Sequence, residues 1–139
     1  MRNSKKTKKV KYIYAVGRRR TANARVRLFR GKGETLVNDK PIAEYFPGKV
    51  AEVAYSKPFQ VTSTLGKYFA TIKVVGSGKN SQLGAVIQGL ARVLDKENTK
   101  LYHSDLKKHG LLTRDSRRRE CRKPGLGGKA RRKKQSPKR

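Results

Sequence analysis

The sequence predicts an α+β protein in which one sheet is covered by one layer of helices. Segments with the character of strands gather before residue 76, a single long amphipathic helix follows the last of them, and strands and helices do not alternate regularly. Basic segments flank this region on both sides. We therefore expect a globular domain over residues 12–110, preceded by a basic extension over 1–11 and followed by an extended basic tail over 111–139.

Five segments are expected to be extended. Residues 12–16 and 24–30 are rich in aromatic and β-branched side chains, and the second segment alternates apolar with polar residues. A Gly-Lys-Gly turn leads into a third strand over 34–38. Residues 59–64 are expected to be extended as well. Residues 68–75 form the clearest strand, because every second side chain is apolar and would face a core.

Proline marks the limits of two short helices. Pro41 can open the first, because the first turn of a helix does not use the amide hydrogen that proline lacks. A second helix is expected to begin near Val50 and to end before Pro58, whose ring would clash with the preceding turn. A last helix is expected over 99–109, with Gly110 as its C-terminal cap.

The main helix follows the glycine-rich loop at residues 76–82. Its apolar side chains recur at spacings of three and four and form a stripe that would pack on the sheet, comprising Leu83, Val86, Ile87, Leu90 and Leu94. Gly84 and Gly89 lie inside this helix, and each costs up to about 1 kcal/mol relative to alanine. We expect a close approach to a neighbouring backbone to compensate for that cost.

The net charge of +28 is concentrated toward the two ends of the chain. Residues 1–32 hold thirteen lysines or arginines and no acid, and residues 107–139 hold fifteen with two acids. Residues 33–106 are nearly balanced, with nine basic and seven acidic side chains. This distribution is typical of a globular domain whose extensions bind a polyanion, so nucleic acid is the predicted partner. An anionic membrane is the rival partner, but the tail lacks an apolar anchor.

The loop at 76–82 precedes a helix as a nucleotide-binding loop does, which makes a phosphate-loop enzyme the rival function. The spacing contradicts it, because a P-loop would need glycine in place of Lys73 and serine or threonine in place of Asn80. The remaining prediction is that backbone amides and polar side chains here hold an RNA phosphate. A plain connecting loop is the alternative.

We expect no cofactor, metal or small-molecule substrate. The candidate metal ligands lack the paired spacing of a zinc site, and they are His103, Asp105, His109 and Cys121. A single cysteine cannot form an internal disulfide, which fits a reducing compartment. No apolar stretch approaches the 18 residues of a membrane span, so none is expected.

Two arginine-rich segments are the candidate RNA-binding elements. Three consecutive arginines at residues 18–20 lie in the connection expected between the first two strands, and their forked donors suit phosphate groups. A solvated turn is the alternative for this connection. In the tail, an arginine recurs at every fourth residue over 114–122, which a brief helix would align along a phosphate track. The tail has no aromatic residue, so we expect it to recognise backbone shape and charge.

Four motifs occur in the order found in a known family. They are GRRR at 17–20 with ARV at 24–26, GSGKNSQ at 76–82 with GA at 84–85, LLTRD at 111–115, and KARR at 129–132 with Gln135, Lys138 and Arg139. With these motifs the chain resembles small-subunit ribosomal protein nine in its bacterial or organellar form. The resemblance covers nearly all of residues 12–139.

The resemblance implies a four-stranded sheet with helices packed on one face and a left-handed crossover. It implies a structural constituent of the head of the small ribosomal subunit, beside other head proteins, and not an enzyme. The bacterial form would reside in the cytoplasm. The domain and the tail would bind small-subunit ribosomal RNA, and Lys138 and Arg139 would contact the anticodon stem-loop of the tRNA in the peptidyl site.

The residues expected at ribosomal RNA come from both the domain and the tail. They are Arg18, Arg19, Arg20, Arg25, Lys79, Gln82, Arg114, Arg117, Arg118, Arg119, Arg122, Lys123, Lys129, Arg131, Arg132, Lys133 and Lys134. A protein that condenses any nucleic acid is the remaining alternative. The balanced middle of the chain and its amphipathic helix argue against that alternative.

Overall fold

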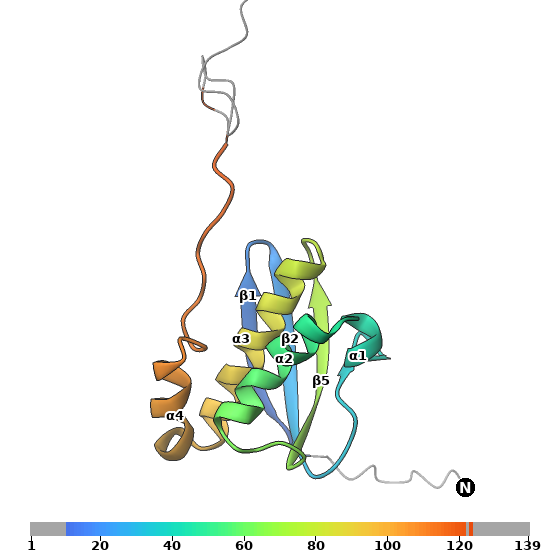
Figure 1. The fold of residues 1–139 in the computed structure, drawn as a ribbon, viewed down its shortest axis with the longest axis vertical. Helices are drawn as coiled ribbons and strands as arrows, with labels where there is room; N and C mark the ends of the chain where they lie inside the picture. The colour runs from blue at the N-terminus through green and yellow to red at the C-terminus, as the bar shows by residue number, and fades with distance from the viewer. Residues whose placement is uncertain (1–10, 122, 124–139) are drawn as a thin grey trace, which may run out of the picture.

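The computed structural model describes residues 11–121 and 123, which form an α+β fold. The strands are β1 (Ile13–Arg19), β2 (Ala22–Arg30), β3 (Leu36–Val37), β4 (Lys40–Pro41) and β5 (Tyr68–Val75). The helices are α1 (Ile42–Tyr45), α2 (Lys49–Val61), α3 (Lys79–Glu97) and α4 (Thr99–Lys108). Helices α2 and α3 lie across one face of β1, β2 and β5 (Figure 1). The predicted fold class is therefore confirmed.

The sheet has the strand order β1-β2-β5-β3-β4. Strands β1, β2 and β5 pair antiparallel, while β3 runs parallel to β5. The described sheet has five strands where the resemblance implies four, because Asn38 and Asp39 adopt positive φ and turn β4 back onto β3. A crossover connection has a defined hand where it joins parallel strands, which here are β3 and β5. The left-handed crossover that the resemblance implies stays a prediction.

The core lies between the sheet and α3. Alternation along β2 and β5 turns every second side chain toward the helices, and the opposed pair Val26 and Ile72 is almost fully buried. Leu90 and Leu94 of the predicted apolar stripe are fully buried on the other side. Burying side chains of this size contributes about 1.5–3 kcal/mol each relative to exposure.

Glycine brings α3 unusually close to β1. A Cβ atom on Gly89 would lie 2.6 Å from Cγ2 of Val26 and 3.3 Å from the backbone nitrogen of Gly17. The expected close approach to a backbone is thus confirmed for Gly89. At Gly84 the neighbour is a side chain instead, because Cδ of Arg19 lies 3.1 Å from the position of a Cβ.

Side chains of α3 also occupy the outer edge of β1. Gln88 Oε1 accepts a hydrogen bond from the amide of Arg18 at 2.8 Å. Arg92 and Lys96, at the following positions of the same helical row, donate to the carbonyl oxygens of Val16 and Tyr14 at 3.1 and 3.0 Å. An unpaired strand edge invites association with another chain. This row of side chains therefore provides hydrogen-bond partners for backbone groups of the edge strand β1 within the molecule.

The hairpin between β1 and β2 is longer than the sequence pattern predicts. The expected connection over 17–23 is wrong, because Gly17, Arg18 and Arg19 belong to β1 and only Arg20 and Thr21 form the turn. Arg18 is exposed and Arg19 is half-buried, in the alternation of a strand. Long basic side chains are compatible with a strand whose outer face meets solvent. The three consecutive arginines were therefore not a reliable sign of a loop.

Helix α2 continues through Pro58 to Val61, so the predicted stop before Pro58 and the predicted extended segment at 59–64 are both wrong. Pro58 is almost fully buried and Phe59 is buried beside the core. Tertiary packing of this last turn outweighs the loss of one helical hydrogen bond at the proline. The other predicted helices are found, and α4 is followed by His109 and then by Gly110 at positive φ.

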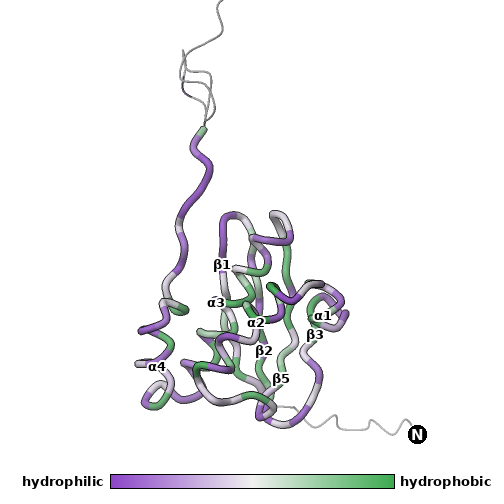
Figure 2. The backbone as a smooth tube through the Cα atoms, in the orientation of Figure 1, coloured by the Kyte–Doolittle hydropathy of each residue, from purple (hydrophilic) through white to green (hydrophobic). Residues whose placement is uncertain are grey.

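The chain leaves the domain after α4. Leu111 and Leu112 still pack against the core, and the amide of Leu111 donates to the carbonyl of Leu106 at 3.1 Å. Residues 114–121 contain neither helix nor strand and extend away from the sheet (Figure 1). Figure 2 shows this segment mostly in the hydrophilic colour, in contrast to β5. The predicted tail thus begins with two apolar residues that hold its origin on the domain.

Candidate RNA-binding surface

One end of the molecule brings together the β1–β2 turn, the loop between β5 and α3, and the start of the tail. A Cβ on Gly76, which has a φ of +84°, would lie 2.5 Å from the carbonyl oxygen of Thr21, so the two connections touch backbone to backbone. The ion pair between Arg19 and Asp115 joins the hairpin to the tail. Segments that are far apart in the sequence therefore form one basic surface, which we call the hairpin end.

Asp115 is the carboxylate that organises the hairpin end. Besides Arg19, it pairs with Arg117, whose Nη2 lies 2.7 Å from Oδ2 and whose backbone amide donates to Oδ1 at 3.0 Å. The side chains of Arg19 and Asp115 are 24% and 27% exposed, so this pair is partly shielded from water. The Arg117 side chain is 83% exposed and stays accessible to a partner.

A groove of about 340 Å³ separates β1, the first turns of α3 and the origin of the tail. Its lining includes Arg18, Arg19, Asn80, Gln88, Leu111 and Thr113. The Nε2 atom of Gln88 is buried and has no hydrogen-bond partner among the described residues. Donors from Arg18, Asn80 and Gln88 line a groove beside the N-terminus of a long helix, which favours anions. The Asp115 carboxylate lines the same groove and offsets the charge of Arg19.

A hydrogen-bond network fixes the loop at 76–82. Gln82 donates to the carbonyl of Gly76 at 3.2 Å and accepts from the hydroxyl of Tyr45 at 2.9 Å. Asn38 donates to the same hydroxyl at 3.3 Å and exchanges hydrogen bonds with the backbone of Val74 at 2.9 Å. Lys79 lies with its Nζ 3.2 Å from the centre of the Tyr45 ring. Gln82 and Lys79 therefore position the loop from within, and their RNA contacts stay predictions.

Comparison with known proteins identifies the family. The family model described as ribosomal protein S9/S16 matches residues 17–139, a range that begins in β1 and includes the whole hairpin end. The chain belongs to this family. Small ribosomal subunit protein uS9 of Dehalococcoides mccartyi strain 195 is 47% identical over 115 residues, covering 83% of this chain and 86% of the relative. The proteins of the same name from strains BAV1 and CBDB1 are each 46% identical over the same length.

Membership of the S9/S16 family confirms the resemblance and makes the chain a ribosomal protein rather than an enzyme. Within residues 11–121 and 123, no three histidine, cysteine, aspartate or glutamate side chains lie together as metal ligands would. No helix in the described part of the chain is long and apolar enough to cross a membrane.

The structure of this S9/S16 member gathers some predicted RNA-binding residues and separates others. The hairpin end unites those of the β1–β2 hairpin with the described arginines of the tail, namely Arg18, Arg19, Arg20, Arg114, Arg117, Arg118 and Arg119. Arg25 lies apart on the sheet face that carries no helix. Lys123 pairs with Glu120 at 2.8 Å. Outside the described residues lie Arg122, Lys129, Arg131, Arg132, Lys133, Lys134, Lys138 and Arg139.

The sequence pattern did not lead us to predict two groups of charged residues as parts of candidate sites in this S9/S16 member. The linking role of Asp115 was not predicted, although it is the one acid among residues 107–119 and a lone carboxylate between arginines indicates an ion pair. Arg27 and Lys73 were also missed. Each lies at a polar position of a strand that was predicted to alternate between apolar and polar residues. That alternation was the available signal, because it places both side chains on the face opposite the apolar one.

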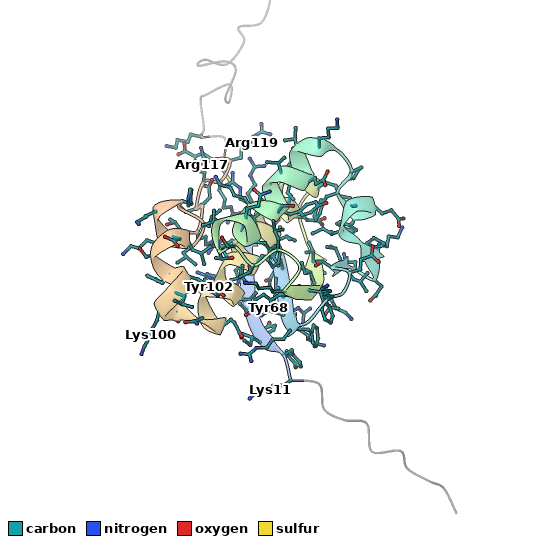
Figure 3. The ribbon with its side chains drawn as sticks, turned by 60° about the horizontal axis from the view of Figure 1, so that its bottom comes forward. Lys11, Tyr68, Lys100, Tyr102, Arg117 and Arg119 are labelled. Atoms are coloured by element: carbon teal, nitrogen blue, oxygen red, sulfur yellow. The ribbon has the colours of Figure 1, made fainter. Side chains whose placement is uncertain are left out.

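The far end of the sheet carries a separate ion pair. Glu97 has a side chain only 4% exposed, and Arg30 reaches its Oε1 with Nε at 2.6 Å. Burial, with the nearby Glu97 carboxylate, raises the pKa of Tyr68 to about 12, and the protonated hydroxyl donates to Glu97 at 3.3 Å. Figure 3 places Tyr68 and Lys11 at this end and Arg117 and Arg119 at the other. This cluster holds α3 to the sheet and lies away from the hairpin end.

Proposed function

We propose that the protein binds ribosomal RNA in the head of the small subunit through its hairpin end and its tail. The observation that carries the proposal is the ion pair between Arg19 and Asp115, which fixes the arginine-rich start of the tail beside the arginines of the β1–β2 hairpin. Fixed guanidinium groups lose less freedom when they meet phosphates than mobile ones do. A pre-formed basic surface of this shape favours a folded RNA over an arbitrary one.

The groove at the hairpin end supports a phosphate contact. Its lining offers the Arg18 guanidinium and the Asn80 amide. The buried Nε2 of Gln88 is a further donor that has no hydrogen-bond partner among the described residues. A phosphate that entered here would approach the N-terminus of the nineteen-residue helix α3. Backbone contacts of this kind position a protein on RNA without reading the base sequence.

The proposal extends to the tail and to a second RNA. Residues 107–139 hold fifteen basic side chains, and the described part of the tail runs from the end of α4 past the β1–β2 hairpin (Figure 1). We propose that the tail follows ribosomal RNA and that Lys138 and Arg139 contact the anticodon stem-loop of the tRNA in the peptidyl site. Neighbouring head proteins are the further proposed partners. The proposed setting is a ribosome of the bacterial cytoplasm, with an organellar ribosome as the alternative.

A salt titration tests the binding of ribosomal RNA. The full chain is titrated with the folded head domain of small-subunit ribosomal RNA and with an unrelated RNA of equal length. Arg18→Gln with Arg20→Gln removes two charges from the hairpin end. Lys49→Gln with Lys57→Gln removes two exposed charges from α2 and is the matched control. Each lost phosphate contact lowers the slope of log affinity against log salt by roughly 0.7–0.9.

We expect the wild type to prefer the head domain at about 0.2 M salt, where non-specific electrostatic binding has weakened. The hairpin variant should lose much of this preference, and the α2 control should keep it. Equal affinity of the wild type for both RNAs would instead support a protein that condenses any nucleic acid. Equal losses in the two variants would show that only total charge matters and would refute the role of the hairpin end.

A further inference from the structure

The sheet has one face that no described helix covers. Helices α2 and α3 both lie on the opposite side of β1, β2 and β5 (Figure 1). Alternation along the strands turns Tyr14, Arg25, Arg27, Thr71 and Lys73 outward on this side. These residues surround a hollow of about 580 Å³ that is also lined by Tyr12 and Leu36. We call this surface the open face.

Aromatic rings on the open face form an ordered column. Phe69 and Phe29 stack with ring centres 5.2 Å apart and planes inclined by 16°, and Tyr12 follows with its centre 5.8 Å from Phe29. Arg27 lies over the Tyr12 ring at 5.2 Å. Phe69 is closed off on one side by Gly33, where a Cβ would lie 2.8 Å from the ring. Tyr12 and Tyr14 remain 46% and 41% exposed, so ring surface is available to a partner.

The charges of the open face lack a protein counterpart. Arg25 stands directly opposite Lys73 in the register of β2 and β5, and like charges in this position destabilise a sheet. In the described part of the chain, neither of these residues nor Arg27 makes an ion pair. One acid, Asp39, lines the hollow beside three cations. An anion bound between β2 and β5 would relieve this repulsion.

We propose that the open face binds a single-stranded segment of RNA, with an unpaired base stacked on Tyr14 and phosphates held by Arg25 and Lys73. Tyr14 lies opposite Arg27 in the β1–β2 register, so a ring and a cation are adjacent on neighbouring strands. Unpaired bases stack on aromatic side chains of exposed sheets, whereas a duplex keeps its base faces covered. An acidic protein segment would neutralise the cations but would leave the exposed ring faces without a specific role.

This inference rests on the proposed function, because it names a second site for RNA on the same molecule. The hairpin end would hold backbone phosphates by charge, and the open face would add a contact that requires an unpaired base. The tail cannot supply that contact, because residues 111–139 contain no aromatic side chain. A signal that reports stacking therefore separates the open face from the tail even in the full chain.

The test uses an oligouridine that carries a single 2-aminopurine, whose fluorescence falls when the base stacks. The full chain should quench the probe at moderate salt. Tyr14→Leu, which keeps apolar bulk but removes the ring, should reduce both quenching and affinity, the latter roughly fivefold or more. Tyr14→Phe should restore them. Tyr55→Leu makes the same change in α2 on the other side of the molecule and should leave both unchanged.

The inference is overturned if Tyr14→Leu quenches the probe as the wild type does. It is also overturned if an oligoglutamate peptide competes for Arg25 and Lys73 while loss of the Tyr14 ring has no effect on the RNA, which would assign the face to an acidic protein. Thermal unfolding of each variant shows whether a loss reflects the fold. Preference for the head domain at about 0.2 M salt tests the proposed function separately, because that preference depends on the hairpin end.

Discussion

Asp115 shows how one residue can organise a basic surface. Its carboxylate binds Arg19 of β1 and Arg117 of the tail, so it joins two arginine groups that would otherwise repel each other. The pair with Arg19 is partly shielded, and charge-assisted hydrogen bonds in such settings contribute more than those in open water. Asp115 therefore acts as a positioning residue for the origin of the tail.

We predict that Asp115→Asn weakens discrimination between RNAs without weakening RNA binding as such. The change adds one positive charge overall, so affinity for unrelated RNA should stay constant or rise. Release of the tail from Arg19 should lower the preference for the head domain, by roughly fivefold if about 1 kcal/mol of pre-organisation is lost. Asp105→Asn in α4 makes the same charge change at an exposed residue and is the control. Equal preference in both variants would contradict the role of Asp115.

At the residue scale, the sequence identifies types of side chain better than their partners. The run at residues 18–20 is recognisable as basic from the sequence alone. That Arg19 pairs with Asp115 depends on the path of the chain after α4, which no local pattern encodes. The internal contacts of Lys79 and Gln82 with Tyr45 were unpredictable for the same reason, because α1 and α3 meet only in the folded molecule.

At the scale of elements, the contact between β1 and α3 determines where the hairpin end lies. The glycine pair Gly17 and Gly89 lets the helix approach the strand backbone, and Gln88 binds the amide of Arg18 in the same region. A bulkier pair would move α3 outward and displace the groove that Arg18 and Asn80 line. Packing inside the domain therefore sets the geometry of the proposed RNA surface.

We predict that Gly17→Ala destabilises the protein by about 1–3 kcal/mol through overpacking. The new Cβ would lie 2.8 Å from Cα of Gly89, and neither backbone can move without shifting its whole element. Gly78→Ala is the matched control, because its Cβ would meet nothing within 4 Å and its φ of −93° is ordinary. Urea unfolding should give a lower midpoint for Gly17→Ala alone. Equal midpoints for both variants would show that α3 can yield at this position.

Predictions of elements succeeded where periodicity was strong and failed where packing overruled a local signal. The stripe of α3 and the alternation of β5 each bury one side, so the sequence pattern alone locates them. Pro58 is tolerated near the end of α2 because the core buries it, and that burial depends on distant residues. Strand β3 lies within the third strand predicted at 34–38, whereas β4 was not predicted, because so short a pairing is formed by its turn.

At the scale of the whole molecule, the fold separates the proposed functional surfaces in space. The described basic segment that follows α4 leaves from the hairpin end, while Lys11 lies at the other end of the sheet (Figure 3). Eighteen residues follow Cys121, and a fully extended chain of that length reaches at most about 60 Å. The proposed tRNA contact can thus lie well beyond the RNA that we propose for the hairpin end.

This separation predicts that removal of Lys138 and Arg139 affects tRNA but not assembly. The hairpin end, the open face and most of the tail's charge are unchanged, so incorporation of the protein into small subunits should be normal. Two lost phosphate contacts should lower the salt slope of tRNA binding in the peptidyl site by roughly 1.4–1.8. The rate of tRNA dissociation from purified subunits should rise accordingly.

The matched variant is Lys133→Gln with Lys134→Gln, which removes two charges earlier in the tail. If tRNA contact is a property of the last two residues, only their removal should speed tRNA release, while the internal variant should mainly weaken binding to ribosomal RNA. Unchanged tRNA retention after the removal would refute the tRNA role and leave the ribosomal RNA proposal intact. Equal effects in both variants would show that the tail acts on tRNA through its total charge, since a diffuse field depends on charge number rather than position.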